Sequence, residues 1–427
     1  MSDVQLGYGK AFVNFSFTED RFELLTLNSL HDRPLTDIEI GDALNTPVES
    51  PSLEDLFRHG DSVLIVVSDA TRATASAQIL NLLVRRLIQA GVSPAEVAII
   101  FATGIHRPVT TAEKLELLTP FIADRLKTID HNASDADAMV LLGSTDRGTP
   151  VEVNRALKNF SHVLITGAIG FHYFAGFTGG RKSICPGLAS AETIKSTHML
   201  ALDFESGGRR AGVGPGLLDG NAVHEECERV AAMIAPSFCI NTVVDGPGRA
   251  VRVYAGQWRA AHRLGCQEYL ASHSLEIDER REVVIVSCGG LPYDLNLIQA
   301  HKALDMAAHA CKDGGSIVLI AECSDGFGHP TFLKWFAEDD SSALEHHLRD
   351  AYEVNGQTAW SLLMKAETYN IQLVSELPDE AVLRMRMTPA RSLSEALSRL
   401  NPKQRGYVMP HGARFLPRCK VISTGCG

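Results

Sequence analysis

A glycine-rich stretch near the middle of the chain, Gly167–Leu200, carries the residues best suited to chemistry. It reads GAIGFHYFAGFTGGRKSICPGLASAETIKSTHML and includes His172, Lys182, Cys185 and His198. Its six glycines let the backbone approach a ligand closely, because residues without Cβ tolerate positive φ and leave room beside the main chain. We therefore expect Lys182, His172 and His198 to lie within reach of one bound group.

Three familiar kinds of site fit this stretch poorly. Gly176–Ser183 ends in Lys-Ser after glycines, but Arg181 occupies the position where a Walker phosphate loop needs glycine. No expected strand is followed by G-x-G-x-x-G, and no three or four metal ligands cluster in the sequence. A nucleotide-dependent kinase or ATPase that uses the Lys-Ser loop nevertheless remains an alternative.

Polar residues also follow four apolar segments that have the length and composition of buried strands, at residues 63–67, 97–101, 162–166 and 283–286. Parallel α/β sheets bind ligands beyond the carboxyl ends of their strands, so these residues are expected to line one site. In chain order they are Asp69, Arg72, His106, His172, Tyr293, Gln299 and Lys302.

The elements that must position these residues alternate between strands and helices, which predicts an α/β fold. We expect two α/β domains with mostly parallel sheets, and we expect the active site in the cleft between them. We predict an N-terminal domain over 1–274, to which 405–427 returns, and a C-terminal domain over 280–400. Leu275–Arg281, rich in charge, is the expected linker. Val151–Lys158 is expected to be a helix with Asn154 facing outward, and Cys419–Ser423 a short strand.

Composition excludes several classes of protein. The chain has 427 residues, a formal net charge of −11 and no long basic run, which argues against a nucleic-acid binder. No uncharged apolar run reaches the ~20 residues that cross a bilayer. The nine cysteines include no C-x-x-C pair, and the first residues do not resemble a secretory signal. These features predict a soluble cytoplasmic protein.

The sequence resembles the nickel-dependent lactate racemase family from roughly residue 60 to residue 420. The matching passages are SDATR, GIHR, FHYFAGFTGGRKSICPG, IKSTHML and QAHK. The resemblance implies that Lys182 is joined covalently to a nickel-pincer nucleotide, a thiolated pyridinium mononucleotide that holds nickel through sulfur, carbon and sulfur. It implies that His198 completes the nickel coordination. Soft sulfur donors on the cofactor would account for the missing ligand cluster in the protein.

The same resemblance implies that His106 and His172 are two acid/base residues acting on opposite faces of one carbon. One imidazole removes the hydroxyl proton while hydride leaves Cα, giving a planar 2-keto acid, and the other acts as acid when hydride returns to the second face. Imidazole suits this role because its ordinary pKa is ~6.5. The matched positions around cofactor and substrate are Asp69, Arg72, Tyr293 and Lys302 for the cofactor, and Arg72, Gln299, Lys302 and Trp360 for the substrate.

These residues also have simpler interpretations. Taken alone, His106 and His172 are compatible with buried structural histidines, Lys182 with a solvated lysine and Trp360 with a core residue. The chain also departs from the family at Ala73–Ala75, where a proline is expected after SDATR. Because proline restricts φ, its absence predicts a looser hold on Arg72.

The predicted function is therefore a racemase or epimerase of lactate or a larger 2-hydroxy acid, working by reversible hydride transfer to the nickel-pincer nucleotide. Enzymes of cofactor biosynthesis are the expected partners, together with the small-molecule substrate. A catalytically inactive cofactor-binding protein is the second alternative.

Overall fold

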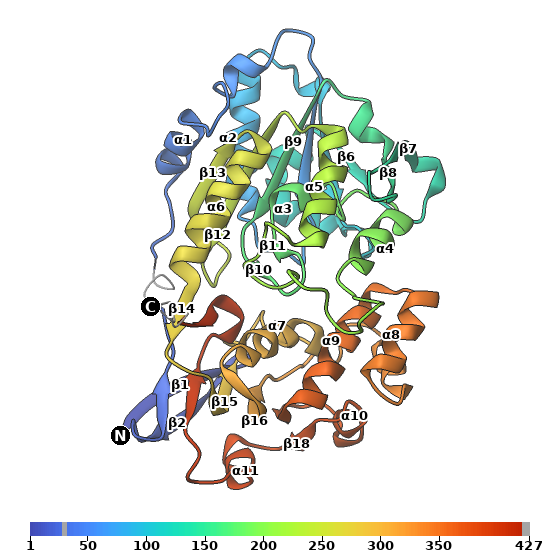
Figure 1. Ribbon diagram of the computed structural model, residues 1–427. Helices are drawn as coiled ribbons and strands as arrows, with labels where there is room; N and C mark the ends of the chain where they lie inside the picture. Colours follow the sequence, from blue (N-terminus) through green and yellow to red (C-terminus); the bar gives the residue numbers. More distant parts are fainter. Residues whose placement is uncertain (28–31, 421–427) are drawn as a thin grey trace, which may run out of the picture. The chain divides into compact units, whose positions relative to one another are not determined.

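The computed structural model describes residues 1–27 and 32–420, and these residues form two compact units (Figure 1). Unit 1 contains residues 1–27, 202–209 and 272–420, and unit 2 contains residues 32–201 and 210–271. Each unit has one six-stranded sheet at its centre, and most neighbouring strands are parallel. The predicted α/β class with two largely parallel sheets is confirmed.

The sheet of unit 2 has the order β13-β12-β9-β4-β5-β6, in which only β12 and β13 are antiparallel neighbours. The predicted strands at 63–67, 97–101 and 162–166 lie at its centre. The six strands are β4 (Val63–Ser68), β5 (Val97–Ala102), β6 (Lys127–Asp130), β9 (His162–Ala168), β12 (Phe238–Val244) and β13 (Ala250–Gly256).

Helices cover both faces of this sheet, which explains why its central strands are continuous apolar runs rather than alternating ones. The side chains of β4 from Val63 to Val67 are fully buried. Helices α1 to α3 pack on one face, while α6 packs on the other, where α5 and α6 lie in front in Figure 1. The helices are α1 (Asp37–Asn45), α2 (Ser76–Gln89), α3 (Thr111–Ala123), α4 (Ala191–Met199), α5 (Ala222–Ile234) and α6 (Trp258–His273).

Two small hairpins and several short helical turns complete unit 2. The hairpins are β7 (Met139–Ser144) with β8 (Pro150–Asn154), and β10 (Phe171–His172) with β11 (Gly176–Phe177). The 3-10 helices are η2 (Glu54–Leu56), η3 (Pro94–Glu96), η4 (Ala136–Ala138), η5 (Arg155–Lys158) and η6 (Gly180–Ser183).

The sheet of unit 1 has the order β18-β17-β16-β15-β19-β3, and all of its neighbouring strands are parallel. Its strands are β3 (Phe22–Leu24), β15 (Arg281–Ser287), β16 (Cys311–Ile320), β17 (Asn370–Val374), β18 (Thr388–Ala390) and β19 (Gly406–Met409). Its helices are α7 (Leu297–Ala308), α8 (Ser341–Asp350), α9 (Val354–Thr368), α10 (Asp379–Arg384), α11 (Leu393–Ser398), η7 (Phe332–Ala337) and η8 (Gly412–Arg414).

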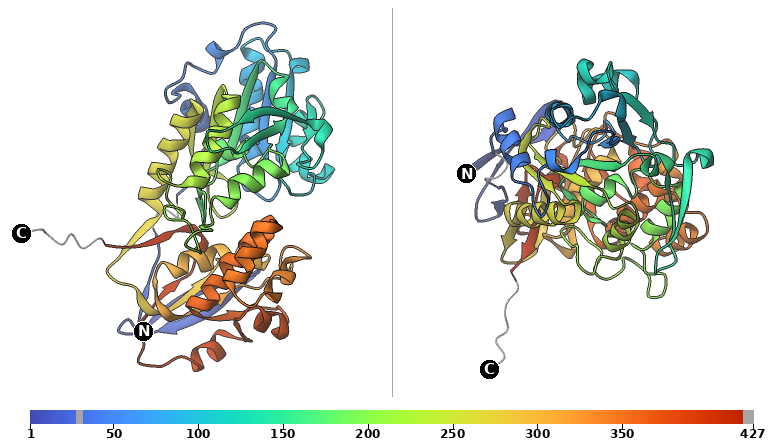
Figure 2. Two further views of the ribbon diagram at one scale, coloured as in Figure 1. Left: turned by 45° about the vertical axis from the view of Figure 1, so that its right-hand side comes forward. Right: turned by 90° about the horizontal axis from the view of Figure 1, so that it is seen from above.

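The N-terminal hairpin, β1 (Ser2–Tyr8) with β2 (Ala11–Phe17), covers one face of this second sheet together with α11. Figures 1 and 2 show the blue hairpin beside the orange and red elements of unit 1. Phe15, Phe17 and Phe22 form an aromatic cluster, with ring centroids 5.4 to 6.3 Å apart. Because this burial ties the first residues to the second sheet, they belong to unit 1.

This grouping differs from the predicted division in two places. The segment 1–27 was assigned by sequence to the N-terminal domain, but β3 pairs with β19 in the second sheet. Of the returning segment 405–427, residues 406–409 join the same sheet as β19, between β3 and β15. Both differences have one cause, since pairing between strands far apart in sequence leaves no local signal.

Two local predictions also need correction, and a third falls largely outside the described residues. Val151–Lys158 is not one helix, because its first half pairs with β7 as β8 and only its second half forms η5; Asn154 is buried and accepts a hydrogen bond from the Ala156 amide. The predicted linker Leu275–Arg281 begins in β14 (Ser274–Ile277), which pairs with β20 (Leu416–Cys419). Of the predicted strand Cys419–Ser423, residues 421–423 lie outside the described residues.

Within residues 1–27 and 32–420, none of the helices is long and apolar enough to cross a membrane.

The packing of unit 1 predicts that Phe22→Ala will destabilise the protein, although this residue is close to the N-terminus. Phe22 is 2% exposed, and removing a buried phenyl ring costs about 3 to 5 kcal/mol of unfolding free energy. The matched control is Phe12→Ala, since Phe12 is 62% exposed. Urea unfolding should separate the two variants, and equal midpoints would contradict the packing described here.

Candidate active site

The ends of β4 and β5 bring Asp69 and His106 into direct contact. Nδ1 of His106 lies 2.7 Å from Oδ2 of Asp69, and the Thr71 amide and hydroxyl both donate to Oδ1, at 3.0 and 2.6 Å. The Asp69 side chain is 7% exposed and that of His106 is 45% exposed. The carboxylate is therefore fixed inside unit 2, while the imidazole extends from it toward solvent.

The Asp69 carboxyl is held in its charged form. Burial alone would raise its pKa, but the hydrogen bond with His106, the hydrogen bond from Thr71 and the positive charge of Arg72 outweigh burial, so the pKa lies below its ordinary value. A carboxylate at this position accepts a hydrogen bond from Nδ1–H of the imidazole. In neutral His106 the lone pair is then on Nε2, the atom that faces away from Asp69.

His172 lies at the end of β10, in the short hairpin that opens the glycine-rich stretch. The Ala175 amide donates to Nδ1 of His172 at 3.2 Å. A nitrogen that accepts a backbone hydrogen bond carries no proton, so neutral His172 bears its proton on Nε2. The two candidate histidines thus have opposite tautomers, with a basic Nε2 on His106 and a protonated Nε2 on His172.

Lys182 lies in η6, and its ammonium form is disfavoured. The Nζ atom is 5.7 Å from the centroid of the Phe174 ring. Burial, followed by the positive charges of Arg181 and Arg72, brings the pKa of Lys182 well below its ordinary range. A lysine in this state is a nucleophilic amine, which is what a covalent attachment needs.

His198 lies on α4, a helix that Ser190 caps by accepting from the Thr193 amide. The imidazole is 5% exposed. Burial, followed by the charge of Lys182, lowers the pKa of His198 to about 3, so the ring is neutral. Metals bind neutral imidazole, and this histidine is therefore available as a single protein ligand.

Phe174 joins three of these residues and was missed by the sequence analysis. Its ring centroid is 4.5 Å from that of His172 and 5.0 Å from that of His198, and Lys182 lies over its face. The only available signal was its place in the matched passage FHYFAGF, because an isolated phenylalanine predicts no more than burial.

The loop that carries Arg72 is held by hydrogen bonds rather than by proline. The Thr242 hydroxyl donates to the Thr74 carbonyl at 3.1 Å, and the Thr74 and Ser76 hydroxyls lie 2.5 Å apart. Ala75, just before α2, has φ of 53°. These contacts fix Thr74 and Ser76, and the looser hold on Arg72 stays a prediction.

The remaining predicted residues belong to unit 1. Tyr293 follows β15, and Gln299 and Lys302 lie on α7, where Nζ of Lys302 donates to Oε1 of Gln299 at 2.6 Å. Trp360 lies on α9 and is 2% exposed. The structure thus groups Asp69, Arg72, His106, His172, Lys182 and His198 in unit 2, and the other four in unit 1.

The residues of unit 2 fit a cofactor that brings its own metal ligands. Among residues 1–27 and 32–420, no three His, Cys, Asp or Glu side chains are arranged to hold a metal ion. Lys182 offers a neutral amine and His198 a neutral imidazole around one aromatic ring. An anchoring amine and one added metal ligand are the two groups that the nickel-pincer nucleotide implied by the sequence resemblance would need.

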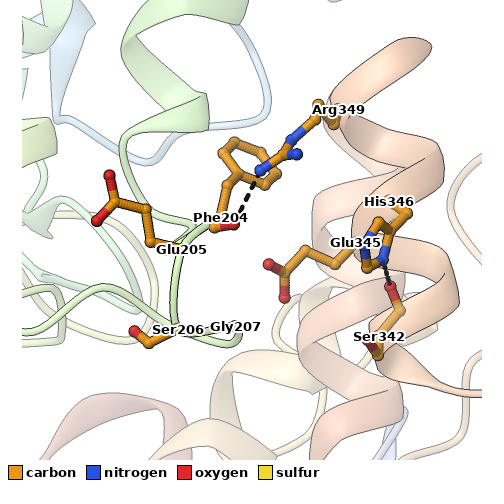
Figure 3. A pocket seen from close by; sticks show the side chains of 8 residues that line it. All are labelled: Phe204, Glu205, Ser206, Gly207, Ser342, Glu345, His346 and Arg349. Atoms are coloured by element: carbon orange, nitrogen blue, oxygen red, sulfur yellow. Dashed lines mark hydrogen bonds between the residues drawn. The ribbon is translucent and has the colours of Figure 1, made fainter.

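A pocket of about 250 Å³ in unit 1 is lined by none of the predicted site residues (Figure 3). It lies between residues 204–207 and α8, where Arg349 donates to the Phe204 carbonyl at 2.9 Å. The Glu345 carboxylate accepts from the Gly208 amide at 2.8 Å. These two contacts join residues 204–208 to α8 within unit 1.

The fold and the site define a mixed α/β protein with two largely parallel sheets and a lysine and three histidines around the strand ends of unit 2. Two domain families match the chain, the lactate racemase N-terminal domain over residues 8–208 and the lactate racemase C-terminal domain over residues 277–408. The chain belongs to the lactate racemase family.

Relatives of known identity match along almost the whole chain. A lactate racemase of Thermoanaerobacterium thermosaccharolyticum is 29% identical over 433 residues, covering 98% of this chain and 100% of the relative. A lactate racemase of Lactiplantibacillus plantarum is 29% identical over 412 residues, covering 93% of this chain and 95% of the relative.

Solved structures show the same architecture. The lactate racemase apoprotein from Thermoanaerobacterium thermosaccharolyticum superposes with a TM-score of 0.90 at 28% identity, over 98% of this chain and 100% of that one. A Thermotoga maritima protein gives a TM-score of 0.67 at 19% identity over 91% and 99% of the two chains, and supports the fold alone.

The state of Lys182 predicts a measurable reactivity in the protein without cofactor. Because its pKa is lowered, Lys182 should react with a short pulse of acetic anhydride at a lower pH than exposed Lys10 does. Peptide mass spectrometry across a pH series measures both sites in one sample. Identical pH profiles would show that the Lys182 amine is an ordinary surface ammonium.

Proposed function

We propose that this protein is a racemase or epimerase of a 2-hydroxy acid that uses a nickel-pincer nucleotide attached to Lys182. Family membership supports the reaction type, and the different partners of the two Nδ1 atoms, the Asp69 carboxylate for His106 and the Ala175 amide for His172, are the observation that carries the proposal. Inverting an α-carbon needs a base on one face and an acid on the other. Nε2 of His106 would be the base, and Nε2–H of His172 would be the acid.

When bound, the nucleotide and its nickel supply the acceptor and donor of hydride at Cα. Side chains of the protein remove and return the proton of the substrate hydroxyl. Nε2 of His106 removes the substrate hydroxyl proton, and Asp69 stabilises the imidazolium that forms. Nε2–H of His172 returns a proton when the planar 2-keto acid is reduced on its other face, and the roles exchange in the reverse direction.

Arg72 is proposed to bind the substrate carboxylate, because a guanidinium offers a planar pair of donors to that group. In unit 1, Gln299 and Lys302 are proposed to contact the substrate, with Gln299 holding the lysine amine in place. Tyr293 is assigned to the cofactor and Trp360 to the substrate. Lactate and larger 2-hydroxy acids remain the candidate substrates.

The experiment that tests this function produces the protein together with enzymes of cofactor biosynthesis. Mass spectrometry should find an adduct on Lys182 and metal analysis should find nickel, while Lys182→Ala should carry neither. A panel of D- and L-2-hydroxy acids, followed by chiral chromatography, identifies the substrate. Absence of both adduct and nickel would refute the cofactor assignment.

Two further outcomes distinguish the alternatives. An adduct without turnover of any tested acid would indicate a cofactor-binding protein. Binding of ATP and magnesium in calorimetry would indicate the nucleotide-dependent class, which the structure disfavours because η6 around Lys182 spans only Gly180–Ser183 and no long helix starts there.

The His106–Asp69 contact predicts that Asp69→Asn lowers the racemisation rate by about 10²-fold, with a smaller change in KM. An asparagine amide no longer stabilises the imidazolium and can place the wrong nitrogen toward the substrate. His106→Ala should lose at least as much activity in both directions. The control is His346→Ala, an exposed residue of α8. Full activity of Asp69→Asn would remove Asp69 from the mechanism.

A further inference from the structure

Arg181, the residue before Lys182, is the most deeply buried cation of unit 2. Only 1% of its surface is exposed. One guanidinium nitrogen, Nη2, donates to the Ala175 carbonyl at 2.7 Å, and Nη1 donates to the Gly179 carbonyl at 3.4 Å. Nη1 also lies 3.0 Å from Nε2 of His262. The planar group therefore joins the two ends of the bend 175–179.

This charge is not explained by an ion pair. Among the residues that the structure describes, no carboxylate oxygen lies within 4.0 Å of the Arg181 guanidinium. Burial lowers the pKa of Arg181, and the groups that oppose this effect are Cys227, Cys266, Glu228 and Cys185. Arginine nevertheless stays charged, since its ordinary pKa exceeds ~12.

A buried cation without a carboxylate partner opposes folding, and an apolar side chain of similar size would avoid that cost. The Arg181 charge therefore has a use other than stabilising the core. Besides His224 and His262, the Arg181 charge acts on its neighbour along the chain, because it is the largest cause, after burial, of the lowered pKa of Lys182.

The backbone around Lys182 is fixed on the side where Arg181 lies. The Gly179 carbonyl accepts from both the Arg181 guanidinium and the Lys182 amide, and the Gly180 amide donates to Oδ1 of Asn241 at 2.8 Å. A Cβ atom at Gly180 would lie 2.6 Å from the His262 ring. Because the Arg181 guanidinium and the His262 ring fill the space on this side of the backbone, the Lys182 side chain extends toward Phe174.

The charged and titratable groups that face Lys182 come from several elements. Arg181 and Arg72 disfavour its ammonium form, while Cys227 of α5 and Cys185 favour it. His198 of α4 is affected by the charge of Lys182 in turn. Arg181 differs from all of these because it also shapes the backbone that carries the lysine.

We propose that Arg181 is a positioning residue for Lys182, whose guanidinium closes the bend 175–179 from the buried side and directs the lysine amine toward the Phe174 ring. Its charge additionally favours the amine over the ammonium at that lysine. The inference rests on the proposed function, in which Lys182 is the cofactor lysine.

The test uses the full chain without cofactor or substrate. In Arg181→Met, the pH midpoint of Lys182 acetylation should rise by about one unit, because a like charge has been removed. Arg263→Met is the matched control, since Arg263 lies next to His262 on α6 and pairs with exposed Asp219. Its midpoint should equal that of the parent protein. An unchanged midpoint in folded Arg181→Met would overturn the electrostatic part of the proposal.

A second measurement covers the case in which Arg181→Met does not fold. Arg181→Lys keeps a positive charge but cannot span the Ala175 and Gly179 carbonyls together. Amide hydrogen exchange of the peptide 174–183 should become about tenfold faster in this variant, as expected when a buried hydrogen bond is lost. Exchange at the parent rate would overturn the positioning role.

These outcomes are independent of the proposed function. A changed midpoint and faster exchange, combined with no adduct on Lys182 in the co-produced protein, would support the positioning role and refute the cofactor lysine. An unchanged midpoint and unchanged exchange, combined with an adduct on Lys182, would support the cofactor lysine and refute the positioning role of Arg181.

Discussion

Two adjacent basic residues, Arg181 and Lys182, follow the glycine-rich bend of unit 2, and the candidate site depends on how the two side chains are accommodated. Arg181 is buried and holds backbone carbonyls, whereas Lys182 extends toward Phe174 as a neutral amine. Glycine at 179 and 180 permits this because both residues adopt positive φ and because a Cβ at either one would meet a neighbour. The bend thus places a charged residue that holds the backbone next to a neutral amine that is suited to chemistry.

Around that bend the ionisable groups keep defined protonation states for different physical reasons. His198 is neutral because it is buried, Lys182 because burial and like charges act together, and Asp69 is charged because hydrogen bonds and Arg72 outweigh its burial. His106 and His172 differ because a carboxylate faces one Nδ1 and a backbone amide the other. Such differences between paired titratable groups are typical of acid/base sites.

Much of this could be predicted from the sequence. The buried strands at 63–67 and 97–101 are continuous apolar runs, and the strand at 162–166 has an apolar centre, as expected for a sheet covered on both faces. The matched passages, above all FHYFAGFTGGRKSICPG, led to the lactate racemase family, which the domain matches confirm. Where the signal was local and strong, as for Val63–Val67, prediction and structure agree.

What the sequence determined by itself is therefore the class of fold, the family, and the residue types offered at the strand ends. Only the tertiary structure decided that residues 1–27 join the second sheet, that Val151–Asn154 pairs as a strand, and that Phe174 contacts His172, His198 and Lys182. It also decided which group faces Nδ1 of His106 and which faces Nδ1 of His172. The physical reason is common to all of them, since strand pairing, ring contacts and hydrogen-bond partners depend on residues distant along the chain, about which local sequence carries no information.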